Sequence, residues 1–172
     1  MHGLQAERRT SLNLAIRRRL SLVAFAVLLV DLLSKSIALK YLTTAPFKVI
    51  GSFVQLELAA NSGAAFSLAQ GKTLFLSLFG FLAILAIFWW GAKLTSQTWA
   101  VALGFILGGV LGNEVDRVFR ASSPLQGRVI DWIKLPHWPI FNLADTSIVI
   151  GAGLIVYLSM RGIKPISHDR SA

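Results

Sequence analysis

Seven ionisable residues stand in or beside otherwise apolar stretches of the sequence: Asp31, Lys35, Glu114, Asp116, Arg117, Asp131 and Asp145. Charged groups are costly in lipid, so such residues are candidates for function. Asp131 and Asp145 offer the most specific chemistry. Two carboxyl groups about 3 Å apart cannot both ionise at neutral pH, so they share one proton. The ionised member can then take a proton from water while the other donates to a carbonyl oxygen, as in an aspartic protease.

Other catalytic groups have little support in the sequence. The chain has no cysteine, which excludes a thiol nucleophile, a disulfide scaffold, an iron–sulfur cluster and a cysteine zinc site. His2, His137 and His168 lie outside the apolar stretches, and neither His-Glu-x-x-His nor Gly-x-Ser-x-Gly occurs. The sequence therefore predicts no metal site.

Asp131 and Asp145 also have structural interpretations. If Asn142 caps a helix, Asp145 takes its third position, where a carboxylate can reach back to the cap amide. Asp131 could instead be a loop acid paired with Arg128. However, Asp145 falls in the first turns of a spanning helix and Asp131 directly before that helix. Both acids are therefore expected at the same membrane boundary, where they can meet in a partly dry site.

For the other five ionisable residues, a structural role is favoured more strongly than a catalytic one. Asp31 and Lys35 are four residues apart, so on a helix they share a face and can form an ion pair that fastens the helix to the loops. Glu114 ends a glycine-rich stretch and is expected to be a solvated charge at the interface. Asp116 and Arg117 follow it, and an arginine near an interface can hold loop carbonyls or a lipid phosphate.

The composition indicates that these residues lie in a membrane protein. The chain has 172 residues, 55% of them hydrophobic and 15% charged, with a mean hydropathy of +0.65. A soluble domain has about 25% charged residues, and a helical membrane span needs about 20 residues. Apolar stretches at 20–42, 74–92, 95–113 and 139–160 therefore predict a single all-α integral membrane domain over residues 1–172, a four-helix bundle without a soluble catalytic domain.

Two connections are too long for tight turns. Residues 43–72 mix strand-like alternation with turn residues, which predicts a small extracytoplasmic β-rich cap between the first and second helices. The polar connection over 114–137 contains two prolines and is expected to lie across one face of the bundle.

The basic residues set the expected orientation. The net charge of +9 and the pI of about 10.7 fit anionic lipid headgroups rather than nucleic acid, since the apolar stretches require a bilayer. Five arginines precede the first span, so the positive-inside rule places the tail 1–19 in the cytoplasm. Four crossings return the tail 161–172 to the same side. The N-terminus also has the layout of a secretory signal, but Asp31 and Lys35 after its apolar core favour a retained helix.

Five motifs together resemble those of the lipoprotein signal peptidases, also called signal peptidase II. In chain order they are Asp31-x-x-x-Lys35, Asn61-Ser62-Gly63-Ala64-Ala65-Phe66, Gly112-Asn113-x-x-Asp116-Arg117, Val129-x-Asp131 and Phe141-Asn142-x-Ala144-Asp145. The resemblance extends over about residues 20–157. The chain differs from the family pattern at Leu32, where Gln is frequent, at Val110, where Ala is common, and at Glu114, where an apolar residue is common.

The resemblance implies a bacterial inner-membrane aspartyl endopeptidase with its site near the outer face. Such enzymes cleave prolipoproteins before the diacylglyceryl-modified cysteine, without metal or cofactor. Carried over by motif, the catalytic pair is Asp131 and Asp145. Substrate-binding and supporting positions would be Asn61, Gly63, Asn113, Asp116, Arg117 and Asn142. The segment 61–66 would close over the site like a lid, and one chain would contain every part needed, as a monomer in contact with membrane lipid.

Two functions of other classes remain open at this point. Intramembrane acids also mark proton paths, so a small proton-coupled carrier is the principal alternative. Carriers commonly contain duplicated halves, and the sequence shows no internal repeat. A non-enzymatic membrane assembly factor is the third possibility, but it leaves the ordered asparagine and aspartate motifs unexplained.

Overall fold

Four long helices and a small sheet make up the computed structural model, which describes residues 2–61, 73–120 and 125–167, with side chains from residue 11 onward. The elements are α1 (His2–Tyr41), β1 (Phe47–Ile50), β2 (Val54–Asn61), α2 (Thr73–Gly91), α3 (Gln97–Phe119), β3 (Val129–Lys134) and α4 (Leu143–Met160). Each helix contains a segment long and apolar enough to cross a membrane. The prediction of four spanning helices is confirmed.

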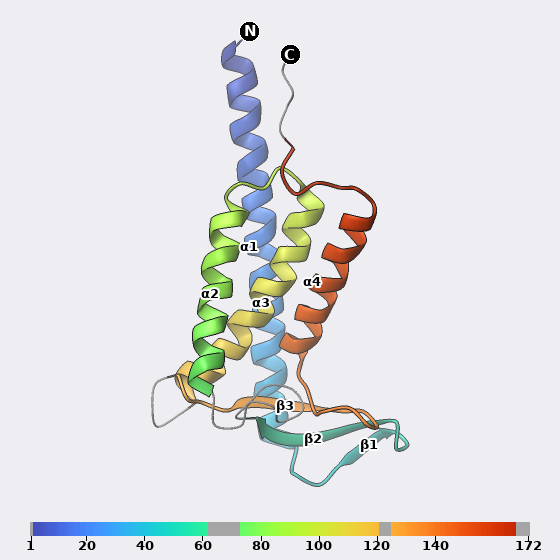
Figure 1. The fold of residues 1–172 in the computed structure, drawn as a ribbon. Helices are drawn as coiled ribbons and strands as arrows, with labels where there is room; N and C mark the ends of the chain where they lie inside the picture. The colour runs from blue at the N-terminus through green and yellow to red at the C-terminus, as the bar shows by residue number, and fades with distance from the viewer. Residues whose placement is uncertain (1, 62–72, 121–124, 168–172) are drawn as a thin grey trace.

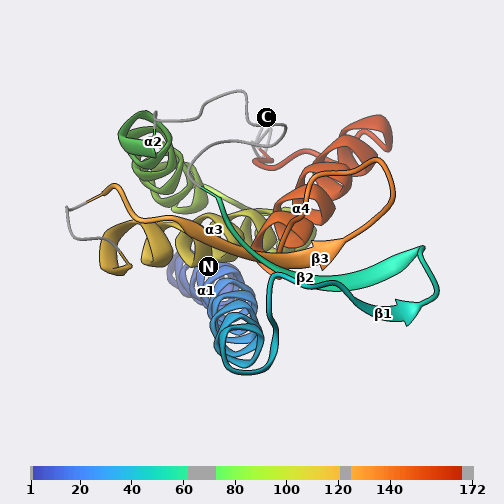
Figure 2. The ribbon, with the colours of Figure 1, turned by 90° about the horizontal axis from the view of Figure 1, so that it is seen from below.

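Helix α3 is the centre of the bundle. It packs against α1, α2 and α4, and Figure 2 shows it among the other three helices. In its most apolar window 61% of the residues are buried, against 22–28% in the other helices. Those helices expose Phe, Leu and Val side chains outward, which suits lipid rather than water.

Glycines let the helices approach α3 closely. A Cβ atom at Gly108 would lie 2.6 Å from the carbonyl oxygen of Ala24 on α1. A Cβ at Gly109 would overlap the carbonyl oxygen of Ala144 on α4. Small residues at helix contacts therefore bring α1 and α4 against neighbouring sides of α3, where Gly112 meets both Asp31 and Ala144.

The three-stranded antiparallel sheet covers the end of the bundle opposite the start of α1 and the end of α4 (Figure 1). Its order is β1-β2-β3, with Phe47 opposite Leu56 and Ala59 opposite Asp131. The β1–β2 hairpin reaches to one side of the helices in both ribbon views. Ile133 exchanges backbone hydrogen bonds with Phe141, which brings the start of α4 against β3.

Several element boundaries differ from those expected. The cap is not confined to residues 43–72, because β3 from the later connection completes the sheet and buries Val129 and Ile130. Helix α1 begins at residue 2, so the basic segment before residue 20 continues the helix. Helix α3 continues to Phe119 rather than ending at 113, because its last charges pair with one another. Helix α4 begins only at Leu143, where Asn142 caps it.

Candidate active site

Asp131 lies in β3, where the sheet meets the bundle. Pairing of β2 with β3 sets Asn61 opposite Val129, two residues from Asp131 on the same face of the strand. The Asn61 side-chain amide donates to Oδ2 of Asp131 at 2.9 Å. The Asp131 side chain is almost fully buried, with 2% exposed. The alternative in which Asp131 pairs with Arg128 is not observed, since within the described residues the side-chain hydrogen bonds of Asp131 are to asparagines.

Asn142 joins the two acids. It caps α4 in a capping box, in which its side-chain oxygen Oδ1 accepts the backbone N–H of Asp145 at 2.9 Å. In return, Oδ2 of Asp145 accepts the backbone N–H of Asn142 at 3.3 Å. The Asn142 amide nitrogen donates to Oδ1 of Asp131 at 2.6 Å. The expected capping role of Asn142 is therefore observed, and the same residue also contacts Asp131.

Asn113 of α3 holds the other side of Asp145. Its amide nitrogen donates to Oδ1 of Asp145 at 2.8 Å. Its side-chain oxygen Oδ1 accepts from Nζ of Lys35 at 3.1 Å and from Nδ2 of Asn142 at 3.2 Å. Three asparagines, from β2, α3 and the start of α4, thus hold the two carboxyl groups, and Asn142 contacts both acidic residues.

The environment of Asp131 favours its protonated form. Burial raises the pKa of Asp131 to about 7, and the nearby Asp145 carboxylate is the second cause. The hydrogen bonds donated by Asn61 and Asn142 favour the ionised form and oppose this rise. The Asp145 side chain is only half-buried. The arrangement therefore suits one protonated and one ionised carboxyl group near neutral pH.

A buried ion cluster binds the backbone next to Asp131 and Asp145. Nζ of Lys35 lies 2.7 Å from Asp31 and 2.9 Å from Asp116, and all three side chains are fully buried. Oδ1 of Asp31 accepts the N–H of Ala144 at 2.9 Å, and Oδ2 of Asp116 accepts that of Ile130 at 3.2 Å. These two N–H groups belong to the residues immediately before Asp145 and Asp131.

The ion pair between Asp31 and Lys35 was expected from the sequence, but the further contacts of Lys35 were not. The spacing of four residues indicates the pair, whereas nothing in the sequence indicates that Lys35 also binds Asp116 and Asn113. The signal for this connection is weak because the partners lie some eighty positions along the chain, and only helix packing brings them together.

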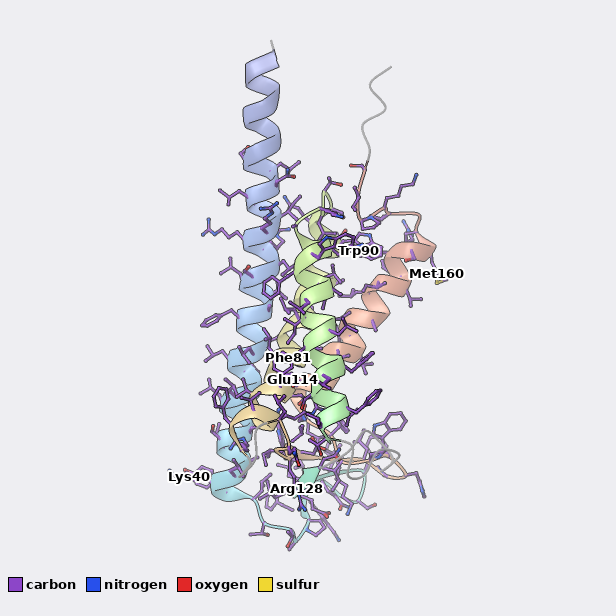
Figure 3. All side chains as sticks on the ribbon, turned by 60° about the vertical axis from the view of Figure 1, so that its left-hand side comes forward. Lys40, Phe81, Trp90, Glu114, Arg128 and Met160 are labelled. Carbon is purple, nitrogen blue, oxygen red and sulfur yellow. The ribbon has the colours of Figure 1, made fainter. Side chains whose placement is uncertain are left out.

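Glu114 and Arg117 lie to one side of the two acids. The prediction of a solvated Glu114 is wrong, because its side chain is buried between α3 and α2, where Gly80 leaves room for the carboxylate (Figure 3). Nη1 of Arg117 lies 2.6 Å from Oε1 of Glu114. Among the described side chains, Arg117 makes no hydrogen bond with Asp131 or Asp145. Gly63 and the rest of the expected lid after residue 61 lie outside the described residues.

Comparison with known proteins supports a single family. The sequence profile described as "Signal peptidase (SPase) II" matches residues 23–161. A lipoprotein signal peptidase of Mycobacterium avium (strain 104) is 49% identical over 149 residues, covering 84% of this chain and 82% of that protein. One of Mycobacterium leprae (strain Br4923) is 47% identical over 149 residues, covering 84% and 74%.

A solved structure supports the same conclusion at the level of the fold. A bacterial membrane enzyme determined by the in meso method at 2.3 Å resolution superposes with a TM-score of 0.73 at 28% identity, covering 88% of this chain and 93% of that one. Signal peptidases hydrolyse peptide bonds. The chain therefore belongs to the signal peptidase II family and is a peptidase.

Proposed function

We propose that this peptidase is of the aspartic type and uses Asp131 and Asp145 as its catalytic pair. The observation that carries the proposal is the contact of Asn142 with both residues, which fixes their relative orientation. The raised pKa of Asp131, to about 7, supports placing the shared proton on that residue. A proton-coupled carrier is not favoured, because the family is one of peptidases.

The geometry suggests the following steps. Ionised Asp145 takes a proton from water as the water oxygen bonds to the scissile carbonyl carbon. Asp131 gives its proton to the carbonyl oxygen, forming a tetrahedral diol. When the C–N bond breaks, Asp145 passes its proton to the leaving nitrogen and Asp131 recovers one from the diol. Both carboxyl groups return to their starting states.

The supporting residues act on the two acids at different distances. Asn61, Asn113 and Asn142 hold the carboxyl oxygens through neutral donors, which leaves the charge of the pair unchanged. Asp116 acts through the backbone before Asp131. Arg117 supports the end of α3, where Nη1 of its side chain pairs with the buried Glu114 carboxylate at 2.6 Å.

The substrate we propose is a prolipoprotein, cleaved before its diacylglyceryl-modified cysteine. The relatives are named lipoprotein signal peptidases, which supports this class. Burial of lipid chains contributes about 0.8 kcal/mol per CH₂ group, so two acyl chains can place the scissile bond by binding remote from it. We further propose that the sheet end faces the outside, that both termini are cytoplasmic, and that the monomer is active, since both acids and all three asparagines come from one chain.

Cleavage of a purified lipidated precursor, followed by gel shift, tests the proposal. Asp131→Asn and Asp145→Asn should each remain folded and lose at least about a hundredfold in rate, the lower range for acid–base catalysis. Glu57→Gln is the matched control, because Glu57 pairs with Lys134 in the sheet, away from the acids, and its variant should cleave normally. Near-normal cleavage by either Asp variant would exclude the pair. Equal cleavage of lipidated and unmodified precursor would exclude the lipid from recognition.

A further inference from the structure

One buried charge, that of Glu114, has no part in the proposed reaction steps. Glu114 lies near the end of α3, and only 4% of its side chain is exposed. Its Oε2 atom is buried and has no hydrogen-bond partner among the described residues. The carboxylate fits against α2 because that helix has Gly80 there, where a Cβ atom would overlap Oε1. Burying a carboxylate costs free energy unless another contact compensates for it.

The compensating contact is Arg117, one turn further along α3. Its Nη1 atom lies 2.6 Å from Oε1 of Glu114, and 14% of its side chain is exposed. A guanidinium has five N–H donors, and among the described residues Glu114 is the one acceptor of this side chain. The other guanidinium nitrogens are not sealed in the interior, so they can donate to a bound molecule.

The turn that carries Arg117 borders both proposed catalytic acids. Asn113, four residues earlier on the same helix face, donates to Asp145 at 2.8 Å. The backbone carbonyl of Arg117 accepts the N–H of Gly127 at 2.9 Å, in the segment that leads into β3 and Asp131. An extended peptide bound at the two acids can therefore bring a backbone carbonyl oxygen to the guanidinium.

Stability alone does not account for this buried ion pair. Apolar residues of similar volume are often at least as stabilising as such a pair. Here the pair is also incomplete, since one oxygen of Glu114 stays unpaired. What the carboxylate adds, and an apolar side chain could not, is a fixed orientation of the Arg117 guanidinium.

We propose that Glu114 is a positioning residue for peptide cleavage and acts through Arg117. Its carboxylate holds the guanidinium in one orientation, and the remaining N–H donors bind a backbone carbonyl oxygen of the precursor. A side chain that is ordered beforehand loses less entropy when the substrate arrives, so the effect is on substrate binding. The proposal rests on the proposed function for its substrate, but not on which residues share the proton.

Cleavage kinetics of the full chain on lipidated precursor test this coupling. Glu114→Gln keeps the shape of the side chain and removes its charge. KM should rise by about two- to tenfold, the cost of ordering one long side chain, while kcat changes little. Arg117→Met, which removes the donors, should raise KM at least as much. Adding Glu114→Gln to Arg117→Met should raise KM no further, because Glu114 then has nothing to position.

Gly80→Ala tests the same contact from α2. The new methyl group meets the tip of a flexible side chain, so the Glu114 carboxylate should move rather than the helix. KM should rise as in Glu114→Gln. In the double variant Glu114→Gln/Arg117→Met the same alanine should leave KM unchanged. This second comparison contains no unpaired buried carboxylate, so it stands even if Arg117→Met alone does not fold.

The pair of Glu57 and Lys134 in the sheet provides the matched control. Glu57→Gln breaks an acid–base pair away from the two acids and should leave both kinetic parameters unchanged. Melting temperatures in detergent show which variants have folded.

An unchanged KM in Glu114→Gln, or a rise that persists when Arg117 is replaced, would overturn the proposal. Failure of the proposed function has a different signature. Normal cleavage by Asp131→Asn would exclude the catalytic pair and leave the coupling between Glu114 and Arg117 in place. Loss of that coupling, with Asp131→Asn inactive, would overturn the role of Glu114 alone.

Discussion

The side-chain amide of Asn142 donates to Oδ1 of Asp131 at 2.6 Å while its carbonyl oxygen accepts the backbone N–H of Asp145 at 2.9 Å. One residue thus both begins α4 and sets the second acid against the first. The helix cap and the proposed catalytic pair share a single side chain, so their contributions can be separated by substitution.

Asn142→Ser separates the cap from the contact with Asp131. Serine is a good N-cap but is too short to replace the amide donor, whereas Asn142→Ala removes both functions. Both variants should lose most of their cleavage rate. Only Asn142→Ala should also lose about 1 kcal/mol of folding stability through the cap. Rates on lipidated precursor and melting curves in detergent measure the two effects, and full activity in Asn142→Ser would contradict the proposed role of the contact.

The pH dependence of cleavage follows from Asp131. Its pKa is raised by burial and by Asp145 to about 7, so kcat/KM should fall as the pH rises through about 7, where the shared proton is lost. The same raised pKa affects stability. The protonated Asp131 contributes to the free energy of unfolding fully below its unfolded pKa of 3.8, and this contribution is lost as the pH rises through about 7. Profiles of kcat/KM and melting temperature against pH measure both.

Asn61→Ala should move that profile. The Asn61 amide favours the ionised form of Asp131, so its removal raises the pKa, and the alkaline limb should shift upward by about one pH unit. Glu57→Gln, in the same strand but away from the acids, is the control and should leave the limb in place. A downward shift in Asn61→Ala would contradict the assignment of the limb to Asp131.

Lys35→Met should be strongly destabilising. It leaves Asp31 and Asp116 as buried carboxylates without their common cation, and breaking a buried pair in this way costs about 3–5 kcal/mol. The double variant Asp31→Asn/Lys35→Met should recover part of the loss. The exposed Arg128→Gln, as a control, should change stability by less than about 0.5 kcal/mol. A loss in Lys35→Met as small as that of the control would show that the cluster is not needed for folding.

Gly108→Ala and Gly153→Ala form a matched pair for helix packing. The new methyl at Gly108 meets Ala24 and Val27 of α1, so it should cost about 1–3 kcal/mol. At Gly153 nothing lies within 4 Å, so alanine should stabilise α4 by up to about 1 kcal/mol through helix propensity. Unfolding in detergent should therefore change in opposite directions, and equal effects would contradict the packing of α1 on α3.

The sequence contains the local part of this architecture. Long apolar stretches require helices in lipid, an Asn three residues before an Asp indicates a capping box, and acid and base four apart indicate an ion pair. Each of these signals lies within one element, so it can be recognised without knowledge of the fold.

The long-range part could not be predicted in the same way. Strand β3 was not predicted within the polar connection over 114–137, because its partner β2 lies some seventy residues earlier in the chain. From its place at the end of an apolar stretch, Glu114 is expected to be a solvated charge at the interface. Its side chain can be buried only because Gly80 on α2 leaves space for it. The reach of Lys35 to Asp116 depends likewise on how α1 packs against α3.

The central claim is that Asp131 and Asp145 share one proton. The ¹³C chemical shift of the Asp131 carboxyl carbon reports that proton directly as the pH is varied. The signal is assigned by comparison with Asp131→Asn, whose spectrum lacks it. We predict a midpoint near 7 in the unmodified chain and a lower midpoint in Asp145→Asn, where the neighbouring charge is gone. A midpoint near 3.8 in the unmodified chain, or one that does not move in Asp145→Asn, would contradict the account.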